Sequence, residues 1–393
     1  MVLTRNFILL FLMLPQLLFA ATTPQKTQIP QATNTRKINS DVRVRMIAAK
    51  DQITLRGMFR LGSSKKLSRY TTLLIRRNGN AWTTQVMGQG SSAAKQVKII
   101  KPMLSFSGEE LTIDEVKLPR EIQILPNNLP GMMDVVAQVD IETYLAGVLP
   151  SEMPKAWPLE AIKAQAVASR TYVFKKMHER KRLHFDVENS IFDQVFRWDA
   201  SNSDSKILQV LNETNHEVLL DPKTKKLVST YYHSQCGGTT ETSKAVWGLD
   251  NLKSVKDKYC IQDSKPWEFQ VSKQKLSEMV KEALNLTNPG ELMNLKVARR
   301  TKSGRAERFL AGFSNKEKHF IRGDQMRSIL GYGNLRSTRV EIESLDEDWS
   351  FKGRGFGHGV GMCQWGAKTM ASENHNYRKI LSHYYPESNI NKF

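Results

Sequence analysis

A glycine stands at every second position from Gly353 to Gly361 in the stretch GRGFGHGVGMCQWGA, which ends at Ala367. Glycines with a period of two would all face one side of an extended segment and leave that side without side chains. Two interpretations are open: a flat or bulky ligand lies against the bare side, or another backbone packs there. The stretch lacks the glycine and lysine spacing of phosphate-binding loops, so we do not expect nucleotide binding.

The first residues have the pattern of a secretory signal peptide over residues 1–20. Arg5 precedes an apolar run from Phe7 to Phe19, and a small residue follows at Ala20. The run is shorter than the roughly 20 residues that a membrane-spanning helix needs. We therefore expect cleavage near Ala20 and an exported chain, in the periplasm or the cell wall. Residues 21–40 are polar and predict a flexible linker.

The charge of the chain narrows the class of partner. Its 393 residues include 58 Lys plus Arg and 39 Asp plus Glu, which gives a formal net charge of +19. A surface of this charge attracts polyanions. For an exported protein these are wall polymers, including peptidoglycan with its acidic stem peptides, and anionic lipids. Export argues against nucleic acid, and the interleaved basic and aromatic residues of single-strand binders are not evident.

Three cysteines, Cys236, Cys260 and Cys363, are an odd number, so at most one disulfide can form within the chain. A bridge between Cys236 and Cys260 and a zinc site that uses His233 and Cys236 remain alternatives. A nucleophile and its base are normally distant in sequence, and His358 and Cys363 are only five positions apart. We therefore interpret Cys363 as a buried, inert side chain.

The pattern of apolar residues divides the remaining chain into two regions. Residues 41–125 contain short alternating runs separated by turn-like segments, which predicts a β-rich region. Over residues 126–393 helical and strand-like patterns interleave without the regular rhythm of a parallel sheet, so we predict a mixed α+β fold. A strand over 134–139 leads there into a short helical stretch, a turn marked by prolines and a long helix with Pro158 in its first turn.

Glu152 is the strongest candidate for a catalytic group. It stands between Pro150 and Pro154 in the segment LPSEMP, with Met153 and Trp157 as apolar neighbours. The prolines restrict the backbone, so we expect the carboxylate to be presented from a rigid turn at a helix entrance. Apolar surroundings raise the pKa of a carboxyl toward the range of a general acid at neutral pH. The alternative is a helix-capping glutamate.

Four segments together resemble the SpoIID/LytB family, named for the stage II sporulation protein D and the amidase enhancer LytB. They are VDIETYLAGVLPSEMPKAWPLEAIKAQAVASRTYVF, YYHSQCGGTTETSKAVWG, SGRAERF with LRSTRVEI, and GRGFGHGVGMCQWGAKTMA. They follow in the family's order over residues 130–390. The resemblance implies a peptidoglycan lytic transglycosylase, a lyase that acts on glycan strands stripped of stem peptides. Other members are described as enhancers of an amidase, and some bind zinc.

The resemblance assigns the catalytic acid to Glu152, the same residue that the local sequence singles out. This carboxyl would protonate the oxygen between N-acetylmuramic acid and N-acetylglucosamine, and then help the muramyl 6-hydroxyl attack its own anomeric carbon. No second carboxylate and no cofactor would be required, unlike the usual two-carboxylate glycosidase. The remaining matches imply substrate contacts at Arg170, Tyr172, Gln194, Gly237, Gly238, Thr239, Gly357, His358, Gly359, Gln364 and Trp365.

Alternatives stay open at several of these positions. Arg170 has the alternative of a buried ion pair, and Gln364 and Trp365 have the alternative of core packing. Lys244 stands where relatives often carry an acid, and FDQVFRW around Gln194 replaces a more usual Gln-x-Tyr-x-Gly segment. The sequence therefore predicts an exported lytic transglycosylase, with a non-catalytic peptidoglycan-binding enhancer of an amidase as the alternative.

Overall fold

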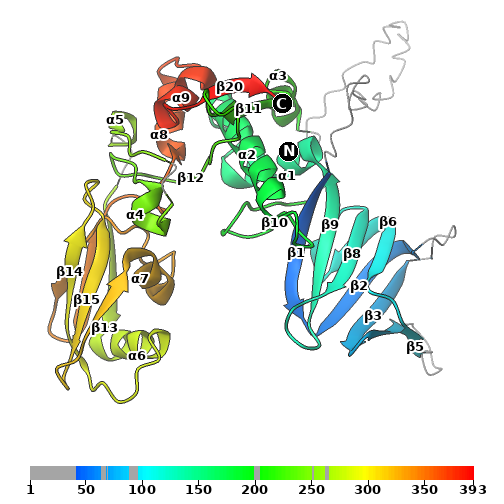
Figure 1. The fold of residues 1–393 in the computed structure, drawn as a ribbon, viewed down its shortest axis with the longest axis horizontal. Coiled ribbons are helices and arrows are strands. Elements are labelled where there is room, and N and C mark those ends of the chain that lie inside the picture. The colour runs from blue at the N-terminus through cyan, green and yellow to red at the C-terminus, as the bar shows by residue number, and fades with distance from the viewer. Residues whose placement is uncertain are drawn as a thin grey trace, which may run out of the picture. The chain divides into compact units, whose positions relative to one another are not determined.

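The computed structural model describes residues 41–62, 68, 70–87, 96–198, 204–249, 252–261 and 265–393 (Figure 1). The signal peptide and the linker expected over residues 1–40 lie outside the described residues. The described part is a mixed α+β structure with a β-rich N-terminal segment, which confirms the predicted fold class. Among the described helices, none combines the length and the apolar character that crossing a membrane would require.

The N-terminal segment forms one mixed sheet, visible in Figure 1 as adjacent blue and cyan strands. Its strands run in the order β10-β1-β9-β8-β6-β2-β3-β4-β5, with β7 beside β6, and only β10 is parallel to its neighbour. The bounds are β1 Asp41–Lys50, β2 Gln52–Leu61, β3 Thr71–Asn78, β4 Ala81–Met87, β5 Gln96–Ile99, β6 Leu104–Ile113, β7 Val116–Lys117, β8 Glu121–Pro126, β9 Met133–Asp140 and β10 Val187–Glu188. The sheet therefore extends beyond residue 125, where we placed the end of the β-rich region.

Three helices follow the sheet or return to it: α1 (Ile141–Glu152), α2 (Leu159–Glu179) and α3 (Ser205–Glu213). Asp140 starts α1 by accepting the N–H groups of Glu142 and Thr143 at 3.0 and 3.2 Å. Helix α2 is buried on all sides from Ala161 to Val173, so it is a central element of the fold. Pro158 precedes α2 as its N-cap, one position before the predicted first turn.

A second group of elements comprises β11 (Glu217–Leu220), β12 (Tyr232–His233), α4 (Ser243–Trp247), α5 (Lys258–Ile261), β19 (Met362–Cys363), α8 (Gln364–Ser372), α9 (Tyr377–Tyr384) and β20 (Asn389–Lys392). Of these, β11, α8 and α9 pack on α2. Strand β11 pairs with β20, and β12 pairs in parallel with β19. Helices α2, α5, α8 and α9 contribute to one apolar core that includes all three cysteines. Segments more than 100 residues apart in sequence meet in this core.

The third group forms two three-stranded sheets, β13-β18-β17 and β14-β15-β16. Its elements are β13 (Trp267–Ser272), α6 (Lys273–Ala283), β14 (Leu292–Arg300), β15 (Ala306–Phe313), β16 (Lys318–Arg322), α7 (Gly323–Leu330), β17 (Val340–Ser344) and β18 (Asp348–Gly353). Both sheets and both helices bury their apolar side chains in a separate core.

The glycine run after β18 is not the extended strand that its period predicts. Gly355, Gly357, Gly359 and Gly361 have φ angles of 84, 108, 86 and 74°, in the left-handed range that favours glycine. The segment lies against the backbone around β12, where Phe356 and Gln235 exchange backbone hydrogen bonds of 2.8 and 2.9 Å. A Cβ at Gly361 would lie 1.9 Å from the Tyr231 carbonyl oxygen. The interpretation of backbone packing is therefore confirmed, and the strand prediction was wrong.

Candidate active site

Glu152 is the last residue of α1, and its side chain is partly exposed. Pro150 lies within the last turn of the helix, and Met153 takes an extended conformation that ends it. The expected position at a helix entrance is thus corrected to a helix C-terminus. The backbone N–H of Val195 donates a hydrogen bond to Oε1 of Glu152 at 3.1 Å. One carboxylate oxygen is therefore fixed by the fold.

The environment of Glu152 favours its protonated form. Burial raises the pKa of this carboxyl to about 7, while the Val195 N–H and the side chains of Gln364 and Tyr232 act in the opposite direction. These neighbours are all uncharged. The C-terminal end of a helix also carries partial negative charge, which disfavours a carboxylate there. A carboxyl with this pKa can both donate and accept a proton near neutral pH.

Gln194 and Tyr172 hold the segment that supplies the Val195 N–H. The buried Gln194 accepts a hydrogen bond on Oε1 from the Tyr144 hydroxyl at 2.9 Å. The Tyr172 hydroxyl donates to Oδ1 of Asp193 at 2.6 Å. Both side chains were predicted to contact substrate. In the structure Gln194 bonds this segment to Tyr144 of α1, and Tyr172 of α2 bonds to the same segment at Asp193. They position the backbone beside the acid.

Arg170 is completely buried. Its Nε and Nη2 donate to the two carboxylate oxygens of Glu142 at 2.8 Å each. Its Nη1 donates to the carbonyl oxygens of Thr214 and Glu217 at 2.9 and 3.2 Å. The structure therefore shows the buried ion pair that was the alternative for this residue. The pair connects α1 and α2 to the chain around β11 and leaves the guanidinium no exposed surface.

The loop of Gly237, Gly238 and Thr239 is held by arginines that the sequence analysis did not single out. Arg339 donates to the Gly237 carbonyl oxygen at 2.6 Å, and the buried Arg305 donates to the Thr239 carbonyl oxygen at 2.8 Å. Arg305 belongs to the SGRAERF segment, which was a family match without an assigned role. Gly238 and the Thr239 side chain are partly exposed, and Gly237 is buried.

His358 faces the same region from the glycine run. Its Nδ1 accepts the N–H of Val360 at 3.0 Å, which leaves Nε2 as the protonated nitrogen of a neutral ring. Burial, Arg327 and Arg305 lower the pKa of His358 to about 3, so the ring stays neutral at pH 7. Its centroid lies 4.9 Å from the ring of Trp247. The backbone of Tyr232 accepts a hydrogen bond from the ring, so both polar atoms of His358 are engaged within the protein.

Two glycines flank His358 and are tightly enclosed. A Cβ at Gly357 would lie 2.8 Å from Cβ of His233, and one at Gly359 would lie 2.6 Å from the Arg305 guanidinium carbon. Their bare side therefore faces protein. Bulky substitution at either position would disturb packing, so it would not report on glycan binding alone.

Gln364 and Trp365 begin α8 beside the acid. Gln364 is buried and influences the pKa of Glu152. Trp365 is partly exposed, and its ring lies 5.3 Å from that of Trp157 at an interplanar angle of 70°. Nζ of Lys368 lies 4.5 Å from the Trp365 ring centroid. Trp365 directly follows Gln364, the neighbour of Glu152, so this aromatic pair with a cation beside it belongs to the same part of the fold. Its rings are suited to the apolar face of a sugar.

The suggested pair of zinc ligands, His233 and Cys236, does not come together around one point. Nδ1 of His233 lies 3.1 Å from the Val360 carbonyl oxygen, and its Nε2 is buried without a partner. The metal-competent group that the described residues form around Cys236 contains Asp257, Cys260 and Cys363, and no histidine. The three cysteines form no disulfide in the structure.

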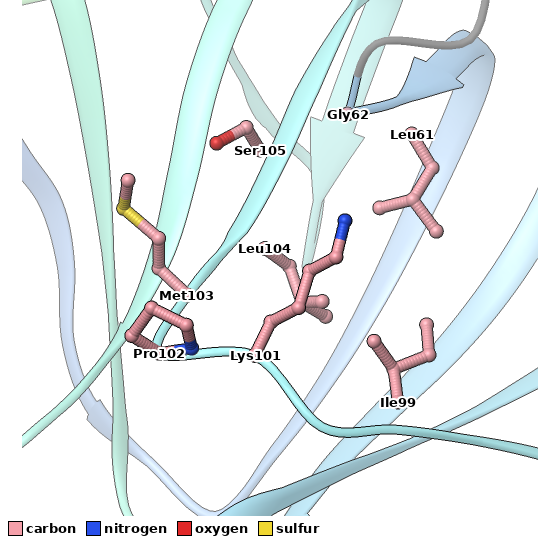
Figure 2. Close-up of a pocket in the computed structure, with 8 residues that line it drawn as sticks. All are labelled: Leu61, Gly62, Ile99, Lys101, Pro102, Met103, Leu104 and Ser105. Carbon is pink, nitrogen blue, oxygen red and sulfur yellow. The ribbon is translucent and has the colours of Figure 1, made fainter.

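A pocket of about 220 Å³ lies in the N-terminal sheet (Figure 2). It is lined by Leu61, Gly62, Ile99, Lys101, Pro102, Met103, Leu104 and Ser105. Figure 2 shows mostly apolar side chains around it, with Lys101 as the single charged group. None of these residues belongs to the surroundings of Glu152, and they include no carboxyl or histidine. We therefore do not assign the chemistry to this pocket.

Two protein-family models match separate regions of the chain. A family model described as Stage II sporulation protein matches residues 130–220, the segment that contains Glu152. A domain family of unknown function matches residues 255–361. An uncharacterised protein of Brachyspira hyodysenteriae is 31% identical over 295 residues, which cover 74% of this chain and 77% of that protein.

Two relatives from Bacillus subtilis carry functional names. The amidase enhancer is 27% identical over 303 residues, covering 63% of this chain and 40% of that protein. The stage II sporulation protein D is 27% identical over 273 residues, covering 65% of this chain and 76% of that protein. Fold and site define a mixed α+β protein with a protonatable carboxyl at the C-terminal end of a short helix. The chain belongs to the SpoIID/LytB family.

Proposed function

We propose that this protein is an exported peptidoglycan lytic transglycosylase in which Glu152 is the catalytic acid and base. Membership of the family supports a role related to the cell wall. The observation that carries the finer proposal is the carboxyl of Glu152, which is partly exposed and has a pKa of about 7, with only uncharged groups among the neighbours that lower this pKa. A structural glutamate would normally be either paired or fully solvated.

In the first step Glu152 donates its proton to the oxygen between N-acetylmuramic acid and N-acetylglucosamine. Near pH 7 about half of the molecules carry this proton. The Val195 N–H occupies Oε1, so the other oxygen is the one that can present the proton to the glycan. The bond from the glycosidic oxygen to the muramyl anomeric carbon then breaks, and the N-acetylglucosamine side leaves with a new hydroxyl group.

In the second step the same carboxylate accepts the proton of the muramyl 6-hydroxyl. The hydroxyl oxygen attacks the anomeric carbon and closes the anhydro ring, and Glu152 regains the proton that it donated. The Val195 N–H stabilises the carboxylate while it is charged. Water and a second carboxylate take no part, which distinguishes this reaction from two-carboxylate glycoside hydrolysis.

Glycan binding is assigned to the partly exposed residues around the acid. Trp157 and Trp365 offer ring surface to a sugar. The partly exposed side chain of Thr239 can bond to hydroxyl or acetamido groups. His358 keeps a positioning role, because its ring is bonded to the backbone of Tyr232 and Val360. Arg170, Tyr172 and Gln194 keep positioning roles, because their polar groups are already bonded within the protein.

A second candidate is a non-catalytic peptidoglycan-binding protein that enhances an N-acetylmuramoyl-L-alanine amidase. The similarity to the amidase enhancer of B. subtilis favours it. In this case the same surface would hold glycan, and an amidase would be the partner. The two candidates differ in whether Glu152 transfers a proton.

Product analysis separates them. The purified chain, its Glu152→Gln variant and the control Glu373→Gln, which neutralises an exposed carboxylate after α8, are incubated with intact sacculi and with amidase-stripped glycan. Mass spectrometry then identifies the new sugar ends. Anhydromuramyl ends from the wild type and the control, absent with Glu152→Gln, would support the lyase. Reducing ends would indicate hydrolysis by water. Glycan binding without cleavage would favour the amidase enhancer.

A further inference from the structure

Four side chains that can ligate a metal meet in the core shared by α2, α5, α8 and α9. Cys236, Asp257, Cys260 and Cys363 are each fully buried, and one ligand atom from each lies within 4.8 Å of the others. They come from the Gly-Gly loop, the start of α5 and the end of β19. Burial of three thiols and a carboxyl in one cluster is costly unless something compensates their charge.

The sulfur atoms receive backbone N–H groups. Gly238 donates to Sγ of Cys236 at 3.2 Å, and the N–H of Cys236 lies 3.2 Å from Sγ of Cys363. Cys363 is the N-cap of α8, where Sγ also accepts the N–H of Gly366 at 3.4 Å. Helix N-termini and N–H donors stabilise thiolates. These N–H groups favour negatively charged sulfur, the form that ligates metals. The neighbouring thiols and burial act in the opposite direction and raise the pKa of Cys236 and Cys363, so a cation would be needed to hold all three as thiolates.

The carboxylate is oriented by its own partners. Oδ1 of Asp257 accepts the N–H groups of Tyr259 and Cys260, each at 3.1 Å. Oδ2 accepts the Tyr384 hydroxyl at 2.9 Å and lies 3.2 Å from Sγ of Cys236. Metal-ligating carboxylates typically have such hydrogen-bond partners, which fix the oxygen that faces the ion. Oδ2 is thus directed toward the sulfur atoms.

Close packing supports the same arrangement. A Cβ at Gly366 would lie 2.5 Å from Oδ2 of Asp257 and 2.0 Å from the Tyr384 hydroxyl, so only glycine leaves this position free. Nη2 of the buried Arg305 donates to the Cys236 carbonyl oxygen at 2.6 Å. This cation offsets part of the negative charge that three thiolates and a carboxylate would bring.

We propose that Cys236, Asp257, Cys260 and Cys363 bind one zinc ion in a closed tetrahedral site. Three soft sulfur ligands and one oxygen, all buried, suit zinc rather than calcium or magnesium. Four protein ligands fill the coordination sphere of a tetrahedral ion, so the site is structural and leaves no position for substrate. Binding releases the thiol protons to solvent.

The proposed zinc ion would hold together two segments that carry residues of the proposed glycan site. Cys363 directly precedes Gln364 and Trp365, and Cys236 opens the loop of Gly237 and Gly238. A metal bound to both cysteines would fix the β12 and β19 segments together. Loss of the ion would therefore loosen two walls of the proposed glycan site without removing a reacting group.

The test measures metal and thiols in the full chain, purified with a non-chelating reductant. Elemental analysis should find one zinc per chain after dialysis. Replacement by Co²⁺ should give thiolate-to-cobalt charge transfer and the spectrum of a tetrahedral ion. Cys260→Ser and Asp257→Asn should each lose zinc, or retain it with a weaker affinity by tenfold or more. The control Asp346→Asn removes an exposed carboxylate and should keep the zinc.

Other outcomes would overturn the proposal. A zinc-free wild type with three titratable thiols in denaturant would mean a site of free thiols. One titratable thiol and a mass lower by two hydrogen atoms would mean a disulfide. Zinc retained at unchanged affinity in both variants would place the metal elsewhere. Because these readings need no glycan cleavage, they hold whether or not Glu152 proves catalytic, and the wild-type spectrum decides even if a variant fails to fold.

Discussion

Helix α1 carries a glutamate at each end, and the two have opposite environments. Glu142, in the first turn, receives a bidentate pair of hydrogen bonds from the buried Arg170 and stands at the positive end of the helix dipole. Glu152, the last residue, stands at the negative end and has uncharged neighbours. The same side chain is therefore paired with a buried arginine at one end of the helix and surrounded by uncharged groups at the other.

The difference shows how one short helix can separate structural and chemical tasks. The Glu142–Arg170 pair uses its charge to hold α1, α2 and the chain near β11 together. Glu152 keeps a proton available because burial raises its pKa and the neighbours that lower it are uncharged. This contrast predicts that substitution of Glu152 will mainly lower activity, whereas loss of the Glu142–Arg170 pair will mainly lower the free energy of unfolding.

The largest expected effect is on activity at the C-terminal end. Glu152→Gln should lower the rate of glycan cleavage by about 10²–10⁴-fold, the usual contribution of a general acid and base. The amide keeps the shape of the side chain but cannot donate an acidic proton. The measurement is the initial rate of anhydromuramyl-end formation, with circular dichroism to confirm folding. An active Glu152→Gln variant would remove the distinction between the two ends.

At the other end the effect should be on stability. Arg170→Met leaves Glu142 and two carbonyl groups without their partner, and breaking such a buried pair costs about 3–5 kcal/mol. Urea unfolding should show this loss, whereas Arg182→Met at an exposed arginine should change stability by less than about 0.5 kcal/mol. A stable Arg170→Met protein that no longer binds glycan would instead return this residue to the substrate contacts.

Much of this contrast could be predicted from local sequence, because its determinants are local. The two prolines and apolar neighbours singled out Glu152, and the period of apolar residues identified the long helix over Leu159–Glu179. The sequence did not show that α1 continues to Glu152. Proline is tolerated in the last turn of a helix when the following residues leave the helix anyway, so Pro150 misplaced the boundary.

What the sequence could not provide depends on contacts between distant segments. Arg305 lies 69 positions from Cys236, whose carbonyl it binds, and nothing near SGRAERF indicates that partner. Asp257 joins the cysteine cluster only after three segments fold together. The glycine run also depends on distant segments. Its period of two predicts an extended strand, but the left-handed glycines lie against Gln235, His233, Arg305 and Tyr231, which are far from them in sequence.

A smaller effect is expected at the aromatic pair beside Glu152. Trp365→Ala removes a partly exposed ring that packs on Trp157, and we expect glycan binding to weaken about tenfold, equivalent to about 1.4 kcal/mol. Isothermal titration with stripped glycan fragments measures this. Phe320→Ala, at an exposed aromatic residue on β16, serves as the control and should bind normally. Unchanged binding by Trp365→Ala would show that sugars contact another surface.

The smallest expected effect is a gain of stability in Glu152→Gln that depends on pH. The pKa of this carboxyl is about 7 in the folded chain against 4.5 as its ordinary value, so between these pH values the folded chain holds a proton that the unfolded chain has released. Wild-type stability must therefore fall relative to the variant as pH rises from 4.5 to 7. One pKa unit corresponds to about 1.4 kcal/mol, so the difference between 4.5 and 7 sets an upper bound of about 3 kcal/mol. Solvent screening of the partly exposed carboxyl reduces the expected effect to about 1 kcal/mol.

Urea unfolding at pH 4 and pH 8 tests this directly. The two proteins should be equally stable at the lower pH, and Glu152→Gln should be more stable by about 1 kcal/mol at the higher one. Glu373→Gln should show no such difference, because its carboxylate is exposed. If Glu152→Gln were instead less stable at pH 8, Glu152 would be stabilising as an anion, like Glu142. The two ends of α1 would then be alike, and the case for Glu152 as the acid would lose its physical basis.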